Sequence, residues 1–253
     1  MSRSGAISAL IIIVGLLAPA ARAEDAARPP VGGVNSLPGA MIFYQARGQD
    51  GACGPNCAAW TAAEGVVEWD TYKRLFAFLE RFGERKVPLV LNVWGQGDLG
   101  VATSLGKIIR ERGLDVSVGT TVVAGCVKAT EAECFALKRG GEPLDAKIDT
   151  SSVECDIVCV LILAGGVRRA LPPSTLVLIG PTRIFDRLAP TVSAERQQGL
   201  RTRYGDQYRL YLAQMGVNAQ LVDIIERNAQ SGRTTPVPRG DWARLGLITP
   251  PAP

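Results

Sequence analysis

The sequence predicts an α/β domain, because three features occur together in it. Hydrophobic residues make up 47% of the 253 residues, which is enough to bury one substantial core. Residues 87–93 form an apolar run of the kind that a parallel sheet buries on both faces. A glycine-rich loop, a segment with apolar residues at helical spacing and a second apolar run at 116–123 follow it. This order predicts a strand–helix–strand unit with parallel strands.

The first 23 residues have the pattern of a secretory signal peptide. Arg3 precedes an apolar run at 7–17, and Ala21-Arg22-Ala23 supplies the small residues of a cleavage site. The run is shorter than the roughly 20 residues of a membrane-spanning helix, so we expect cleavage before Glu24 and no stable membrane anchor. The mature protein is then expected in the periplasm or outside the cell. Residues 24–39 should form a flexible arm, and residues 40–250 a single domain.

The net charge and the cysteines of the chain narrow the expected partners and the expected cellular compartment. Removal of Arg3 and Arg22 leaves 26 basic against 24 acidic residues, a net charge of +2 that gives no reason to expect nucleic acid as a partner. All six cysteines follow the leader, as in a protein of an oxidising compartment. Their spacing favours three local bridges, Cys53–Cys57, Cys126–Cys134 and Cys155–Cys159, although other pairings stay open. Zinc usually requires closer cysteine pairs and histidine, and the chain has no histidine, so we expect no metal and no cofactor.

The N-terminal half of the domain is expected to begin with two strands and a helix. Residues 40–46 and 58–67 are strand candidates, separated by a loop at 48–57 with the turn sequence C-G-P-N-C. Residues 70–82 should form an amphipathic helix. Its expected inward face consists of Tyr72, Leu75, Phe76, Leu79 and Phe82. The strand at 87–93 follows, and then a helix that ends at Gly113, with Leu105, Ile108 and Ile109 inward.

The C-terminal half is organised around residues 153–171. Residues 124–147 are expected to be an insertion that carries one cysteine pair, and 148–153 lead into a buried helix. Cys155 and Cys159 are spaced to share a helical face, Asp156 suits the first turn, and Gly165-Gly166 should end the helix. A strand at 175–179 follows. A helix with an apolar stripe is expected to begin at Ser193. A short second helix should begin at 221–225, and a third should span 241–248. The stripe consists of Tyr204, Tyr208, Tyr211, Leu212 and Met215.

The glycine loop formally matches the dinucleotide-binding pattern G-x-G-x-x-G. It reads Gly95-Gln96-Gly97-Asp98-Leu99-Gly100, and Asp115 follows about 20 residues after the first glycine. However, the acid should stand at the far end of the second strand to reach a ribose, whereas Asp115 stands at its beginning. An exported protein also has little access to nicotinamide cofactors. We therefore interpret these glycines as a tight turn before a helix.

Nucleophilic catalysis requires a base beside the nucleophile, and the choices in this chain are few. Without histidine, neither a Ser-His-Asp nor a Cys-His arrangement can form. A serine–lysine dyad stays open, although no lysine lies in an apolar run that would bury it. Ser151 and Ser152 are accounted for by a turn or a helix cap. The Arg168–Arg169 pair is interpreted as a solvated helix end, with anion binding as the alternative.

Several pieces in order resemble the exported members of the ClpP/crotonase superfamily, the periplasmic ClpP-like proteins. The matching pieces are C-G-P-N-C, V-L-N-V-W-G-Q-G-D-L-G with the helix after it, the C-x₃-C helix with L-A-G-G-V-R-R, the strand end I-G-P-T-R-I, and the C-terminal Y-L-A-Q-M-G-V and W-A-R-L-G-L-I. They cover nearly all of the mature chain. The resemblance implies a spiral of ββα units with a helical C-terminal region and an oxyanion hole made by amides of the glycine loop, here Gly95, Gln96 and Gly97.

The same resemblance implies that the catalytic residues are replaced. Active members carry a serine between the two cysteines, as Cys-x-Ser-x-Cys, and a histidine after the glycine of the later strand. These positions hold Ile157 and Thr182, and a Ser-Pro-Gly-Gly turn is replaced by residues 93–97. We therefore expect no catalytic residues and a catalytically inactive protein that acts by binding an unknown protein or peptide, or by assembly, with a homo-oligomer left open. The alternative is a serine hydrolase or peptidase with an unconventional dyad.

Overall fold

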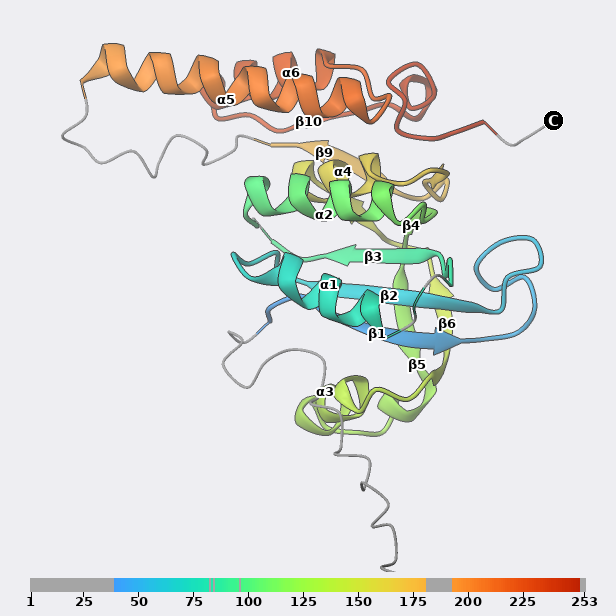
Figure 1. Cartoon of the computed structure of the whole chain (residues 1–253). Helices are drawn as coiled ribbons and strands as arrows, with labels where there is room; N and C mark the ends of the chain where they lie inside the picture. The colour runs from blue at the N-terminus through green and yellow to red at the C-terminus, as the bar shows by residue number, and fades with distance from the viewer. Residues whose placement is uncertain (1–38, 82, 84, 96, 181–192, 251–253) are drawn as a thin grey trace, which may run out of the picture.

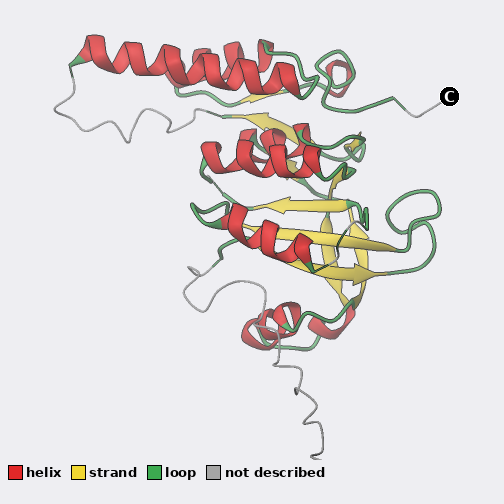
Figure 2. Ribbon diagram, viewed as in Figure 1, coloured by secondary structure: helices red, strands yellow, loops and turns green. Residues whose placement is uncertain are grey.

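A computed structural model describes residues 39–180 and 193–250 of the chain, apart from 82, 84 and 96. The predicted signal peptide, nearly all of the predicted arm and Thr182 lie outside these residues. The described part contains a seven-stranded sheet with helices on it and a smaller sheet under a helical C-terminal region (Figure 1; Figure 2). The predicted α/β fold class is thereby confirmed.

The large sheet has the strand order β5-β6-β1-β2-β3-β4-β8. Its strands are β1 (Ile42–Arg47), β2 (Ala59–Gly65), β3 (Leu89–Val93), β4 (Val116–Val118), β5 (Thr120–Val123), β6 (Leu144–Asp149) and β8 (Arg169–Ala170). β1 and β2 form an antiparallel hairpin, whereas β2, β3, β4 and β8 run parallel to one another. The small sheet has the order β10-β9-β7, made from β7 (Glu154–Cys155), β9 (Leu176–Ile179) and β10 (Thr235–Pro236).

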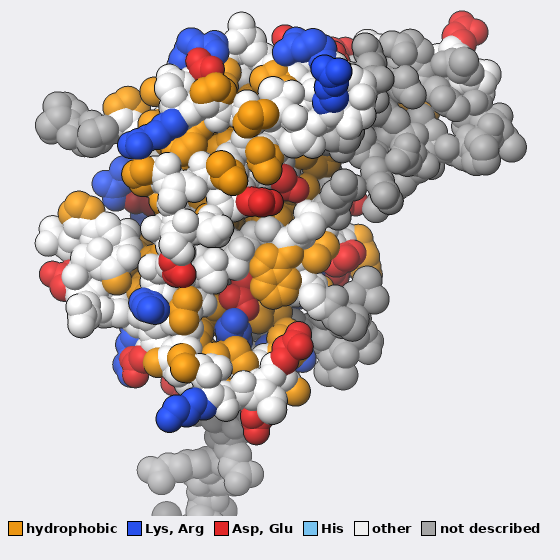
Figure 3. Space-filling model, turned by 180° about the vertical axis from the view of Figure 1, so that it is seen from behind, with side chains coloured by type: hydrophobic (Ala, Val, Ile, Leu, Met, Phe, Trp, Pro, Cys, Tyr) orange, Lys and Arg blue, Asp and Glu red, His pale blue; other side chains and the backbone are white. Residues whose placement is uncertain are grey.

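Helices α1 (Thr71–Glu80), α2 (Leu99–Glu111) and α4 (Ile157–Ala164) enclose the main core with one face of the sheet (Figure 2). The predicted strand–helix–strand unit is confirmed, because α2 connects the parallel neighbours β3 and β4. Leu105 and Ile109 are buried in this core as predicted, and Ile108 is half-buried against it. A second, smaller core on the opposite face includes Tyr44, Trp60 and Val123. Seen from behind, basic and acidic side chains are interspersed with hydrophobic ones (Figure 3).

The predicted strand at 116–123 is two strands. β4 pairs with β3 and β8, and β5 turns away to pair antiparallel with β6. The break falls at Gly119, where a Cβ would stand 2.7 Å from Cγ2 of Ile148. The chain can therefore cross close to β6 only because this residue has no side chain.

The predicted insertion at 124–147 is wrong at its C-terminal end. Strand β6 begins at Leu144 and lies between β5 and β1 within the large sheet. Only the preceding part projects, as the short 3₁₀ helix η1 (Ala124–Cys126) and helix α3 (Glu131–Arg139). Thr130 and Glu133 form a capping box that starts α3. The strand was missed because one face of it is exposed and polar, which gives a weak apolar signal.

The predicted helix at 70–82 is confirmed as α1, but its predicted inward face is wrong in part. Leu75 and Leu79 are buried, together with Phe78. Tyr72 and Phe76 are 36% and 47% exposed, and Phe82 lies outside the described residues. The helix carries aromatic residues on more than one side, so spacing alone did not identify the buried side.

The C-terminal region packs over the small sheet. Helices α5 (Ala194–Gln214) and α6 (Gln220–Ser231) are joined by Arg209, whose guanidinium donates to Asp223 and Glu226 at 2.8 Å. In the predicted stripe of α5, Tyr211, Leu212 and Met215 are buried, Tyr208 is half-buried, and Tyr204 is 38% exposed. The predicted tail helix is a 3₁₀ turn, η3 (Arg239–Asp241), followed by further turns.

Candidate functional site

The predicted buried helix is α4, and it lies at the centre of the main core. All eight of its residues are buried. Two details differ from the prediction: Cys155 belongs to strand β7 before the helix, and Asp156 is the N-cap residue and not part of the first turn. Gly165 ends the helix as predicted. The chain therefore passes directly from a strand end into a buried helix N-terminus, where a catalytic residue would be held rigidly.

The first helical residue is Ile157, at the position that the resemblance assigns to a nucleophile. Its side chain is 5% exposed and is part of the main core. Val158 beside it is equally apolar and buried. The disulfide between Cys155 and Cys159, with a Cα–Cα distance of 5.1 Å, lies beneath them and is also buried. The helix start thus presents hydrocarbon and a closed disulfide, and neither can act as a nucleophile.

Asp156 is the carboxylate nearest to this position in the chain, and it has a structural role. Its Oδ1 accepts a hydrogen bond from the backbone amide of Cys159 at 3.0 Å, which caps α4. Burial raises the pKa of Asp156, and the amides of Cys159 and Val158 partly oppose this shift.

The raised pKa of Asp156 predicts how stability depends on pH. Because the folded-state pKa lies above the unfolded value of about 3.9, the contribution of this group is complete below that value and is lost as pH rises through the folded pKa. Asparagine can cap the helix without titrating. We expect the stability of wild type relative to Asp156→Asn, measured by urea unfolding, to fall as pH rises above about 3.9. A difference that rises with pH for Asp156→Asn would contradict the assignment.

The glycine loop after β3 packs directly on the start of α4. A Cβ on Gly97 would stand 2.8 Å from Cβ of Val67 and 3.2 Å from Cγ1 of Val158. The loop and α4 are distant in sequence and meet here as the resemblance implies. Gly95 has a positive φ of 59°, which favours glycine. Gln96 lies outside the described residues.

Amides around this loop already have protein acceptors. The amide of Trp94 donates to the carbonyl of Gly65 at 3.0 Å, and the amide of Asp98 to the carbonyl of Val67 at 2.9 Å. The Asp98 carboxylate caps α2 by accepting from the Val101 amide at 3.0 Å. Because an oxyanion hole needs donors that point at the substrate, these two amides cannot serve in one.

Tyr208 of α5 is the remaining titratable group linked to the loop. Burial, the Asp98 carboxylate and Tyr204 raise its pKa to about 12. Its phenol is therefore neutral at physiological pH and is a poor general base. Tyr208 was predicted to be part of the apolar stripe of α5, and its proximity to Asp98 could not be predicted because the two residues are far apart in the chain.

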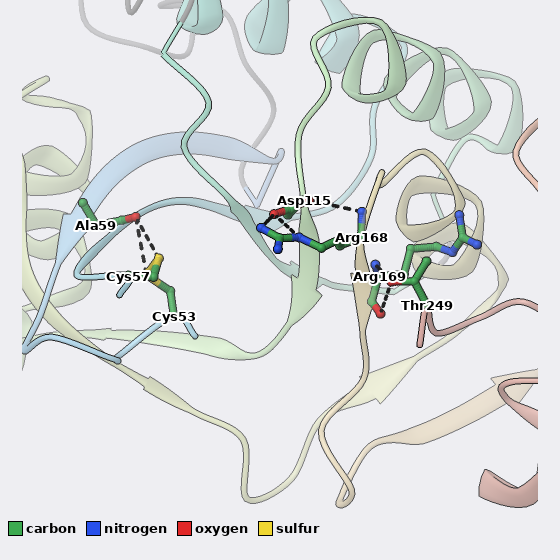
Figure 4. A network of polar contacts seen from close by, with 7 residues as sticks. All are labelled: Cys53, Cys57, Ala59, Asp115, Arg168, Arg169 and Thr249. Atoms are coloured by element: carbon green, nitrogen blue, oxygen red, sulfur yellow. Dashed lines mark hydrogen bonds and ion pairs between the residues drawn. A yellow bond between two sulfur atoms is a disulfide. The ribbon is translucent and has the colours of Figure 1, made fainter. Parts of the chain in front are cut away.

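The three predicted disulfides are confirmed. The Cα atoms are 5.1 Å apart in Cys53–Cys57 and 4.9 Å apart in Cys126–Cys134, and the third bridge is the one at α4. The sulfur atoms of Cys53 and Cys57 both lie 3.5 Å from the carbonyl oxygen of Ala59 (Figure 4). None of the six cysteines is free, so none supplies a thiol nucleophile.

One lysine, Lys138, is half-buried, although it does not lie in an apolar run. The Lys138 side chain is 14% exposed, and its Nζ lies 2.5 Å from Oε1 of Glu64. The Tyr44 hydroxyl donates to Oε2 of the same carboxylate at 2.8 Å, and burial raises the pKa of Tyr44. This ion pair links helix α3 to strand β2 of the large sheet. Its partners are 74 residues apart, so local sequence could not reveal it.

The two adjacent arginines, Arg168 and Arg169, have different roles. Each binds protein groups, so neither is a solvated side chain that is open to an anion. The exposed Arg168 forms an ion pair with Asp115, with Nε 2.8 Å from Oδ2 (Figure 4). Arg169 is buried, and its guanidinium donates to the carbonyls of Gly166 and Met215 at 3.2 and 3.0 Å. The pairing of Asp115 also supports its exclusion as a ribose ligand.

Over residues 39–180 and 193–250, with their three gaps, no group of three or more His, Cys, Asp or Glu side chains is placed to hold a metal ion. In the same part of the chain, no helix has both the length and the apolar character to cross a membrane.

No protein-family model and no curated protein matches the sequence. Solved structures similar to the chain include a ClpP1 variant from Listeria monocytogenes, with 11% identity and a TM-score of 0.41 over 72% of this chain and 86% of that one. They also include two variants of the 1510-N membrane-bound stomatin-specific protease. One, in complex with a substrate peptide, has 12% identity and a TM-score of 0.38 over 72% of this chain and 73% of that one. The other has 14% identity and a TM-score of 0.41 over 72% and 77%. At these values the likenesses carry no argument about the site.

Proposed function

We propose that this chain is a catalytically inactive ClpP-like protein of the periplasm or cell exterior, which acts by binding a protein or peptide or by assembly. The observation that carries the proposal is the apolar start of α4, where Ile157 is 5% exposed at the position of the family's nucleophile. A buried isoleucine there fills the space in which a reacting group would stand.

The other catalytic parts support the same proposal. The chain has no histidine, and its cysteines are all paired. The carboxylates of Asp156 and Asp98 accept backbone amides as helix caps, and two amides of the loop region are bonded to protein carbonyls. The alternative hydrolase would need a lysine amine beside a serine hydroxyl. Across the described residues no such hydrogen bond is formed, and the half-buried Lys138 is paired with Glu64.

Turnover by the mature protein tests this proposal. We expect fluorescein-labelled casein and a p-nitrophenyl ester to be cleaved no faster than in buffer alone. A cleavage rate that is proportional to protein concentration and is lost at the protein's own thermal midpoint would contradict the proposal. A contaminating protease would instead lose its activity at a different midpoint.

Three disulfides are consistent with an oxidising compartment, and the leader pattern completes the localisation part of the proposal. We predict that protein recovered from the periplasm or the medium begins at Glu24. Its intact mass should lie about six hydrogen masses below that of the reduced chain, two for each of the three bridges. A mass that includes residues 1–23, or a native protein that reacts with iodoacetamide, would contradict this prediction.

A further inference from the structure

The outer side of α1 and the residue just before its N-cap carry three exposed rings that the core does not use. Trp69, Tyr72 and Phe76 are 65%, 36% and 47% exposed, and we call them the α1 aromatic strip. The helix is anchored by a different side, through Leu75, Phe78 and Leu79. Figure 1 shows α1 as the outermost layer in front of β1 and β2. Contiguous exposed rings of this size are uncommon on a surface that binds nothing.

Two cations lie over these rings. Nζ of Lys73 is 5.3 Å from the centroid of the Trp69 ring and 5.9 Å from that of Tyr72. Cζ of Arg112, at the end of α2, is 5.6 Å from the ring of Phe76. These distances are those of cation–π contacts. The rings therefore hold two positive charges at defined places on the same surface.

The two cations lack acidic partners within the described part of the chain. Neither Lys73 nor Arg112 forms an ion pair there, whereas the neighbouring Arg74 pairs with Asp70 at 3.1 Å. Lys73 and Arg112 thus keep their capacity to bind carboxylates, and the rings keep apolar area that an aromatic or aliphatic side chain can cover. This combination is complementary to an occupant that carries both carboxylates and apolar groups.

The size of the strip indicates an extended chain as the occupant. Residues 69–76 span on the order of 10 Å along a helix axis, which matches roughly three residues of extended peptide. A segment of this length can place one carboxylate near each cation and an aromatic side chain between them.

We propose that the α1 aromatic strip, with Lys73 and Arg112, is a docking surface for a short acidic segment with aromatic side chains in a partner protein. The proposal rests on the proposed function as a binding protein and names the class of partner. It does not depend on the state of the α4 site, so turnover experiments and binding experiments test the two separately.

A random copolymer of glutamate and tyrosine is a suitable probe. Binding of the fluorescein-labelled copolymer to the mature protein, followed by anisotropy, should saturate and should weaken as salt is raised. We expect Lys73→Glu/Arg112→Glu to weaken binding at least about tenfold, and Trp69→Ala to weaken it several-fold. Trp69 and Lys73 are exposed and Arg112 is half-buried, and none belongs to the buried core. The melting temperature should therefore stay close to that of wild type and report that each variant is folded.

Matched variants separate this surface from general charge and hydrophobicity. Lys128→Glu/Arg233→Glu makes the same change in net charge at two exposed sites elsewhere, and Leu210→Ala removes a side chain that is 61% exposed. Both should bind the copolymer as wild type does. Equal weakening in these controls, or equal binding of a lysine–tyrosine copolymer, would overturn the proposal.

Three further outcomes would also overturn it. The first is the lack of saturable binding by the glutamate–tyrosine copolymer. The second is binding to vesicles that contain phosphatidylglycerol without binding to the copolymer, which would make the surface a membrane contact. The third is concentration-dependent dimerisation that Trp69→Ala abolishes, because a second copy of the chain would then be the occupant.

Discussion

Replacement of Gly165 by alanine is expected to lower the free energy of unfolding by roughly 3 kcal/mol, the upper end of what an added methyl group costs in a packed core. Gly165 ends α4 where this helix crosses α2 at Gly106. A Cβ on Gly165 would overlap the carbonyl oxygen of Gly106 and would stand 2.5 Å from its Cα and 2.6 Å from its carbonyl carbon. These are backbone atoms of a buried helix, so the two helices would have to separate.

Gly199 provides the matched control for this substitution. It lies within helix α5, and a Cβ there would have no heavy atom within 4 Å. Gly199→Ala should therefore stabilise the protein by about 0.5–1 kcal/mol through helix propensity. Urea unfolding of both variants gives the comparison. A Gly165→Ala protein within 1 kcal/mol of wild type would show that α2 and α4 do not approach as closely as described.

Arg169→Ala is expected to cost about 3 kcal/mol of stability, because several buried carbonyls share this guanidinium. Its Nη1 donates to the carbonyls that follow α4 and α5, those of Gly166 and Met215. Arg110 donates to the same two helix ends, at 3.0 Å to Gly165 and 3.1 Å to Met215. Burial, and then the neighbouring Arg110, lower the pKa of Arg169. The two arginines stay together in the interior because carbonyls at two helix C-termini compensate their charge.

Three further variants test the role of Arg169. Arg233→Ala, at an exposed position, should change stability by less than about 0.5 kcal/mol. Arg169→Lys keeps the charge but not the fork of donors, so an intermediate loss is expected. In a double-mutant cycle, Arg110→Ala and Arg169→Ala should be non-additive, since they share the Met215 carbonyl. Additive losses of stability, or a small loss for Arg169→Ala, would contradict the inference that the two arginines together bind the carbonyls at the ends of α4 and α5.

Features that depend on neighbours in sequence could be predicted. The apolar run that forms β3 is buried on both faces and therefore lacks alternation, which identified it without a structure. The three disulfides join cysteines 4 or 8 residues apart, so spacing sufficed. The N-cap and C-cap of α4 followed from one aspartate and one glycine, with an error of a single position at Asp156.

Features that depend on distant partners could not be predicted. The partial burial of Lys138 on helix α3 follows from Glu64 and Tyr44, which lie on strands β2 and β1. The outward orientation of Tyr72 and Phe76 was decided by which side of α1 meets the sheet, and several sides of that helix carry rings. The candidate site shows the same division. Ile157 could be located from its cysteines, whereas the packing of Gly97 on Val158 required the fold.

The central claim is that the protein is catalytically inactive and has no working nucleophile, and covalent labelling tests this claim most directly because it needs no knowledge of a substrate. The folded mature protein would be incubated with a fluorophosphonate and weighed intact, beside a serine hydrolase as positive control. We predict no mass increase for this protein under conditions that label the control completely. Stoichiometric labelling of one serine, lost when the protein is first unfolded, would contradict the claim and would identify an active site elsewhere in the chain.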